Sequence, residues 1–176
     1  MTRESEEQAV LTTVRLVLRR PAEGDLPSIV KHANDWEVAR LLGRVPHPYS
    51  MDDARFFLEK VVPNELTWAI TSRVDNTFMG VIGLAPGARS RVAELGYWLG
   101  RCFWGNGFAT EAGSAVVQYA FRTLGLARLT SGYFIGDLAS DRVLTKLDFV
   151  RTGEDERQCL AQRKAVRSVE MELAQT

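Results

Sequence analysis

Cysteine and histidine are scarce in this 176-residue chain, which holds two of each. Cys102 and Cys159 have neither the spacing of a metal-binding pair nor the number that a disulfide framework needs. We therefore expect no metal site and a reducing, cytoplasmic setting. No apolar run reaches the ~20 residues of a membrane span, and the polar, acidic Met1–Val10 segment does not resemble a signal peptide.

Net charge is also absent, because 22 Lys and Arg residues balance 22 Asp and Glu residues. This balance gives no electrostatic reason to expect nucleic acid or a membrane as a partner. Apolar residues make up 45% of the chain and charged residues 25%, which is typical of a globular protein. The length suits one domain with a full core. With no repeats or low-complexity segments, we predict a single domain over 1–176 with a frayed tail at 1–10.

The first half of the chain carries strand and helix signals separated by short turns. Val14, Leu16 and Leu18 alternate with neighbours of more polar character, which indicates a strand with one buried face. Asp25 and Ser50 precede helical patterns and are good N-caps. In order, this half predicts a strand over 13–19, helices over 25–34, 34–42 and 51–61, and an antiparallel meander of strands over 66–72, 77–85 and 92–99.

The second half begins with a turn and a long amphipathic helix that ends at Thr123. A strand over 127–135 follows, and a strand–helix–strand step implies a parallel crossover. We then expect a helix over 138–147, a short strand near Val150, a variable loop over 154–166 and a final strand over 168–173.

The turn before that long helix contains Gly105 and Gly107. Unpaired backbone N–H groups at a helix start bind phosphate, and residues without a Cβ allow an anion to approach closely. A plain strand-to-helix turn is the alternative. The nucleotide-kinase loop would need Gly-Lys-Ser/Thr, and the dinucleotide fingerprint would need three glycines near the start of its domain.

The run Trp104-Gly105-Asn106-Gly107-Phe108-Ala109-Thr110-Glu111-Ala112 resembles the acetyl-CoA pyrophosphate loop of the GNAT acyltransferases. Tryptophan at the first position resembles the RimJ/RimL branch, which acetylates protein N-termini and some small amines. The resemblance implies an α/β (α+β) GNAT fold, with a mixed, mostly antiparallel sheet of six to seven strands and helices on both faces. It also implies acetyl-CoA as cosubstrate, held by Trp104, Gly105, Asn106, Gly107, Phe108, Ala109 and Thr110.

The same resemblance implies where the pantetheine arm would lie. Strand 92–99 is expected to diverge from its parallel neighbour, 127–135, so that unpaired backbone groups near Trp98 and Leu99 meet the arm. Asp137 stands where the family has an asparagine that contacts the cofactor. A negative charge there should not help binding unless the side chain caps the following helix.

Two residues are predicted to act in catalysis. Glu94 lies on the strand that should meet the thioester and resembles the general base of several GNAT enzymes, with a purely structural carboxylate as the alternative. The tyrosine that usually meets the departing thiolate is replaced by Leu144. Ser140 resembles the serine of the RimJ/RimL branch whose hydroxyl can bond the sulfur, with a local helix cap as the alternative.

The first two helices and their loop line the acceptor pocket in GNAT proteins. The resemblance therefore makes substrate-side candidates of Trp36, Arg40, His47 and Tyr49. Alternatively, Trp36 and Tyr49 are packing residues and His47 is a solvated loop histidine.

Together these features predict an acetyl-CoA-dependent N-acetyltransferase that acts on a primary amine by direct attack in a ternary complex. Neither cysteine has a recognisable base partner in the sequence. The alternatives are a non-catalytic acyl-CoA-binding module and, with less support, a nucleotide-binding protein. Relatives of this branch also imply a homodimer.

Overall fold

A computed structural model describes residues 8–175. One sheet of eight strands runs through the molecule in the order β1-β2-β3-β4-β5-β6-β8-β7. The strands are β1 Leu11–Thr12, β2 Leu16–Arg19, β3 Leu66–Ser72, β4 Phe78–Pro86, β5 Val92–Leu99, β6 Arg128–Phe134, β7 Val150–Cys159 and β8 Lys164–Ala174. Every neighbouring pair is antiparallel except β5 and β6.

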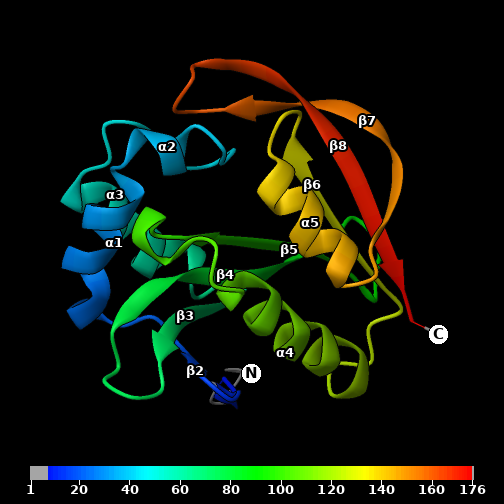
Figure 1. Ribbon diagram of the computed structural model, residues 1–176, viewed down its shortest axis with the longest axis horizontal. Helices are drawn as coiled ribbons and strands as arrows, with labels where there is room; N and C mark the ends of the chain where they lie inside the picture. The colour runs from blue at the N-terminus through cyan, green and yellow to red at the C-terminus, as the bar shows by residue number, and fades with distance from the viewer. Residues whose placement is uncertain (1–7, 176) are drawn as a thin grey trace, which may run out of the picture.

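Helices cover both faces of this sheet (Figure 1). They are α1 Leu26–Ala33, α2 Trp36–Ala39, α3 Met51–Phe56, α4 Phe108–Arg122 and α5 Leu138–Lys146, with short helical turns η1 Glu23–Asp25, η2 Phe57–Val61 and η3 Arg101–Phe103. Apolar residues of α4 and α5 pack on one face, and those of α1 and α3 pack on the other. The expected mixed, mostly antiparallel architecture with helices on both faces is confirmed. The strand beyond the expected six or seven is the short β1.

Side-chain caps fix where several helices begin. Asp35 accepts a hydrogen bond from the Glu37 backbone N–H at 2.9 Å at the start of α2. Ser50 and Asp53 form a reciprocal capping box at the start of α3. Asp137 accepts from the Ser140 backbone N–H at 3.1 Å at the start of α5. Ser50 caps its helix as expected, whereas Asp25 makes no side-chain cap bond to α1 and pairs with Arg19 instead.

The pair β5–β6, the only parallel pair among residues 8–175, separates soon after it forms. Val92, Ala93 and Glu94 of β5 pair with Arg128, Leu129 and Thr130 of β6, and the pairing ends there although both strands continue. At the next position the Ser131 hydroxyl donates to the Leu95 carbonyl at 2.8 Å. The remainder of β5, to Leu99, therefore has no β-strand on its β6 side. We call this opening between β5 and β6 the fork.

Three segments differ from the sequence-based expectation. The helix expected over 34–42 is only the short α2, Trp36–Ala39. The strand expected over 13–19 is broken at Thr13, whose hydroxyl accepts from the Leu16 N–H at 3.0 Å and turns the chain between β1 and β2. The loop expected over 154–166 is wrong, because most of it belongs to the β7–β8 hairpin. β7 is a mostly exposed edge strand, so polar residues on both sides of it hide the alternation that marks a half-buried strand.

The expected tail at 1–10 lies partly outside the described residues. Within them, the Gln8 side chain donates to the Thr67 carbonyl at 2.8 Å, and the Trp68 indole donates to the Ala9 carbonyl at 2.8 Å. Residues 8 and 9 are therefore attached to β3 instead of frayed.

Candidate active site

The glycine-bearing loop lies between β5 and α4, beside the open end of the fork. Gly105 and Gly107 both adopt left-handed backbone conformations, with φ of 76° and 80°. The Asn106 side chain donates to the carbonyls of Phe103 and Trp104 at 3.2 and 3.0 Å, which fixes the bend. Gly107 is the N-cap of α4 and supplies no side-chain cap. The first backbone N–H groups of α4 are thus left for a ligand.

The loop is also tied to the open edge of β5. The Trp104 indole N–H donates to the Leu99 carbonyl at 2.9 Å, while the Trp104 side chain stays partly exposed. A Cβ added at Gly105 would meet no atom within 4 Å. The residues present therefore fit a diphosphate on the loop with an extended arm entering the fork. Phe108, Ala109 and Thr110 form the first turn of α4 beneath the loop.

Arg15 is a cation beside the loop that the sequence analysis did not identify. Its guanidinium donates to the Asn106 carbonyl at 3.0 Å and lies 4.4 Å from the centre of the Phe108 ring. Glu111 of α4 holds it through an Nε–Oε2 contact of 2.7 Å and accepts further bonds from the Thr13 hydroxyl and the Arg15 backbone N–H. No sequence signal links residues this far apart in the chain.

Glu111 should make the stability of the fold depend on pH. Burial alone would raise the pKa of this carboxyl, but the hydrogen bonds from Thr13 and Arg15 outweigh burial and lower it. A lowered folded-state pKa contributes stability above the unfolded-state pKa of about 4.3, and that contribution is lost as the pH falls through the folded-state value. We expect Glu111→Gln to reduce the free energy of unfolding by about 1–2 kcal/mol at pH 7, and by progressively less below about pH 4.

Urea unfolding at several pH values measures this difference. The exposed Glu156 makes no side-chain ion pair among the described residues, so Glu156→Gln is the matched control with little effect at any pH. An equal loss from Glu111→Gln at pH 7 and at pH 3 would contradict the role given to the Glu111 carboxylate.

Alternation along β5 places its side chains on the two faces of the sheet in turn. Leu95, Tyr97 and Leu99 pack with the core under α4 and α5. Trp98 packs on the opposite face, where its ring centroid lies 6.1 Å from that of Phe78. Glu94 shares the face of Trp98, which is the α1–α3 face.

Glu94 lies at the base of the fork, as its last paired residue on β5. Its side chain is partly exposed and accepts a hydrogen bond from Arg157 of β7 at 2.5 Å. Arg157 also donates through Nε to Glu170 of β8 at 2.8 Å. These two carboxylates raise the pKa of Arg157, and Glu170 has a larger effect than Glu94. The sequence analysis missed Arg157 because it lay in the segment expected to be a loop.

Asp137 and Ser140 form a closed pair at the start of α5. The Ser140 hydroxyl donates to one Asp137 carboxylate oxygen at 2.7 Å, and its backbone N–H donates to the other. Asp137 therefore caps α5. This is the arrangement in which a carboxylate can stand at this position although its negative charge would not help cofactor binding. The cofactor contact of Asp137 and the sulfur contact of Ser140 stay predictions.

Only part of the predicted acceptor group comes together. Trp36 is exposed and packs edge-on against His47, with ring centroids 5.4 Å apart. Arg40 forms an ion pair with Glu37 at 2.7 Å on α2. Tyr49 is buried in the core between α1 and α3, and burial raises its pKa to about 12. The structure thus places Tyr49 among packing residues and leaves Trp36, His47 and Arg40 near the surface.

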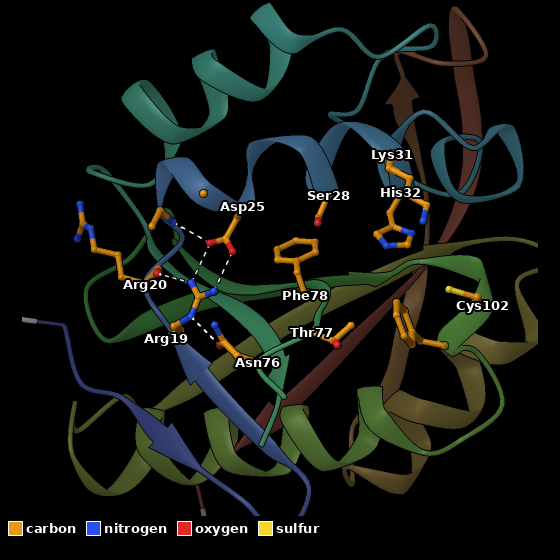
Figure 2. A pocket seen from close by; sticks show the side chains of 13 residues that line it. Arg19, Arg20, Asp25, Ser28, Lys31, His32, Asn76, Thr77, Phe78 and Cys102 are labelled. Carbon is orange, nitrogen blue, oxygen red and sulfur yellow. Dashed lines mark hydrogen bonds and ion pairs between the residues drawn. The ribbon is translucent and has the colours of Figure 1, made fainter. Parts of the chain in front are cut away.

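A separate hollow of about 660 Å³ lies between α1 and the β4–η3 region (Figure 2). The His32 ring stacks near Phe78 and meets Phe103 edge-on, with centroids 6.5 and 5.5 Å away. On its wall Arg19 and Asp25 form a bidentate pair with both contacts at 2.8 Å. None of the four predicted acceptor-side residues lines this hollow.

Among residues 8–175, no helix combines the length and apolar character required to cross a bilayer. The same residues contain no group of three or more His, Cys, Asp or Glu side chains that could hold a metal ion.

Comparison with known proteins agrees with this geometry. Residues 15–150 match the family described as acetyltransferase (GNAT) domain. An uncharacterized N-acetyltransferase, YoaA, from Bacillus subtilis is 34% identical over 152 residues, covering 82% of this chain and 84% of the relative.

Solved structures share the fold. A GNAT-family acetyltransferase from Bacillus anthracis superposes with a TM-score of 0.84 at 18% identity, covering 94% of this chain and 98% of the other. A ribosomal L7/L12 α-N-protein acetyltransferase, RimL, in complex with coenzyme A, gives a TM-score of 0.81 at 16% identity, covering 94% and 98%. The resemblance to the RimJ/RimL branch is consistent with these matches. The chain belongs to the GNAT acetyltransferase family and is an N-acetyltransferase of the kind that uses acetyl-CoA.

Proposed function

We propose that this protein transfers the acetyl group of acetyl-CoA to a primary amine, either a protein or peptide N-terminus or a small amine, by direct attack in a ternary complex. The observation that carries the proposal is the fork, which opens just after Glu94 with the glycine loop at its far end. An extended thioester lying in the fork would present its carbonyl near Glu94. The RimL neighbour was solved in complex with coenzyme A, which supports coenzyme A as a ligand of this fold.

Glu94 is the proposed general base, because it lies at the base of the fork on the face away from α4 and α5. An amine approaching from the α1–α3 face would meet Glu94 there, with Trp36, Arg40 and His47 on the same side of the sheet. A protein N-terminal amine, with a pKa near 7.7–8.0, has a useful neutral fraction at physiological pH, whereas lysine, near 10.4, does not. This favours an N-terminus as acceptor, and the acceptor of the RimL neighbour supports that choice.

Direct transfer is favoured over a covalent acyl-enzyme. Cys159 is buried, and its thiol faces the Leu42 carbonyl at 3.4 Å instead of a base. Cys102 is exposed on η3 and lines the hollow away from Glu94. We also propose that the protein is cytoplasmic and forms a homodimer.

A thiol-release screen with acetyl-CoA tests the proposal. The acceptors are peptides with varied first residues, polyamines and aminoglycosides, and we expect at least one class to raise the rate of thiol release above hydrolysis by about tenfold or more. The Cys102→Ala variant should keep this rate. Acetyl-CoA binding without amine-dependent release in any class would instead indicate the non-catalytic acyl-CoA-binding module.

A further inference from the structure

Tyr97 lies on the open stretch of β5, three residues beyond Glu94. The carbonyls of Leu95 and Leu99 point away from β4, since they accept from Ser131 across the fork and from Trp104 of the loop. Backbone groups of a strand alternate in direction with a period of two residues, so the N–H and C=O of Tyr97 point the same way. The main chain of Tyr97 therefore faces the fork.

The side chain of Tyr97 lies on the α4–α5 face, opposite to Glu94. Its hydroxyl oxygen is buried and has no hydrogen-bond partner among residues 8–175. A buried hydroxyl without a partner is unfavourable, which points to a missing acceptor. Burial raises the pKa of Tyr97, and the charge on Asp137 adds to that rise. The hydroxyl thus lies close to the start of α5 and keeps its proton well above neutral pH.

Neither Ser140 nor Leu144 of α5 has a free proton to offer. The Ser140 hydroxyl donates its one proton to Asp137. Leu144, where the family has its tyrosine, is fully buried and has no donor. The unpaired hydroxyl of Tyr97 on β5 can therefore take the role of the tyrosine that is absent from α5.

We propose that the Tyr97 hydroxyl donates a hydrogen bond to the sulfur of acetyl-CoA as this sulfur leaves; the inference rests on the proposed function. The amine nitrogen forms a bond to the thioester carbonyl carbon, and the carbon–sulfur bond breaks with its electron pair remaining on sulfur. The surplus amine proton passes to the Glu94 carboxylate and then to water. Tyr97 keeps its own proton, and the thiolate takes up a proton from water after release.

The test compares coenzyme A with desulfo-coenzyme A, which lacks the sulfur, by calorimetry on the wild type and on Tyr97→Phe at about pH 9. At this pH part of the thiol is ionised while Tyr97 is still protonated. A hydrogen bond to an ionised acceptor is among the strong ones, so we expect Tyr97→Phe to weaken coenzyme A binding by about tenfold or more. Binding of desulfo-coenzyme A should stay unchanged.

Tyr133→Phe is the matched control, because the Tyr133 hydroxyl donates to Asp141 at 2.7 Å on the other side of the fork. It should leave both affinities unchanged. Tyr97→Phe should be at least as stable as the wild type in thermal unfolding, since it removes an unpaired polar group. Its kcat should fall with little change in the KM for acetyl-CoA.

Equal effects of Tyr97→Phe on the two ligands, or no effect on either, would overturn the role of Tyr97 and leave the proposed function standing. Failure of the wild type to bind either ligand would overturn the proposed function and this inference with it.

Discussion

Replacing Gly107 by valine should reduce the affinity for acetyl-CoA by about a hundredfold or more. Gly107 has a φ of 80°, and a β-branched residue in this region must shift the backbone or bear strain of about 1–2 kcal/mol. A shift would turn away N–H groups of the loop and of the first turn of α4. Each hydrogen bond to a charged group is worth about 1.5–3 kcal/mol, so the loss of two accounts for the expected effect.

Gly125 provides a control with the same backbone strain. It has a φ of 64° just beyond the other end of α4, and an added Cβ there would meet no atom within 4 Å. Gly125→Val should lower the melting temperature about as much as Gly107→Val but leave acetyl-CoA binding intact. Calorimetry on both variants makes the comparison. Unchanged affinity in Gly107→Val would mean that the loop does not hold the diphosphate.

The sequence predicted those parts of the site that are contiguous in the chain. The loop of residues 104–110 could be located because its glycines and the following helix lie within one short motif. The parallel crossover from β5 to β6 followed from a strand–helix–strand pattern, whereas the divergence of these two strands was implied by the resemblance to the GNAT family. Local chemistry also explains Asp137, whose role as a cap depends only on residues three positions away.

Contacts between distant segments could not be predicted in this way. Arg157 reaches Glu94 across 63 positions, and Arg15 reaches Glu111 across 96. Both depend on which strands and helices become neighbours, and no local pattern encodes that. The lack of a hydrogen-bond partner for the Tyr97 hydroxyl also results from packing, since it depends on every group around that hydroxyl. An aromatic residue in an apolar strand shows only that the position is half-buried.

Changing Glu94 to glutamine should lower kcat at pH 7 by about a hundredfold with the proposed acceptor, because a positioned general base contributes on the order of 10²–10⁴. The substitution keeps the size of the side chain and its ability to accept from Arg157. Acetyl-CoA affinity should be unchanged. The variant should also recover part of its rate between about pH 7 and pH 9, as an N-terminal amine with a pKa near 7.7–8.0 loses its proton without help.

Glu154→Gln is the control for this measurement. Glu154 is also an ion-paired carboxylate of β7, but its partners are Arg151 and Arg167 on the outer hairpin. It should leave kcat and its pH dependence unchanged. An active Glu94→Gln variant with the wild-type pH profile would show that the Glu94–Arg157 pair only joins β5 to β7.

The ion pair with Arg157 opposes a role for Glu94 as base, since a neighbouring cation favours the ionised carboxylate. Glu170 changes this balance, because it shares the same guanidinium and its pKa is lowered chiefly by Arg157. Two carboxylates around one cation leave a net negative charge at the base of the fork, which suits the arrival of a protonated amine. In Glu170→Gln, the Arg157 guanidinium should interact with Glu94 alone, which should make Glu94 a weaker base. We therefore expect a lower kcat, reduced by a smaller factor than in Glu94→Gln. If Glu170→Gln raised kcat instead, Arg157 would not be restraining the basicity of Glu94.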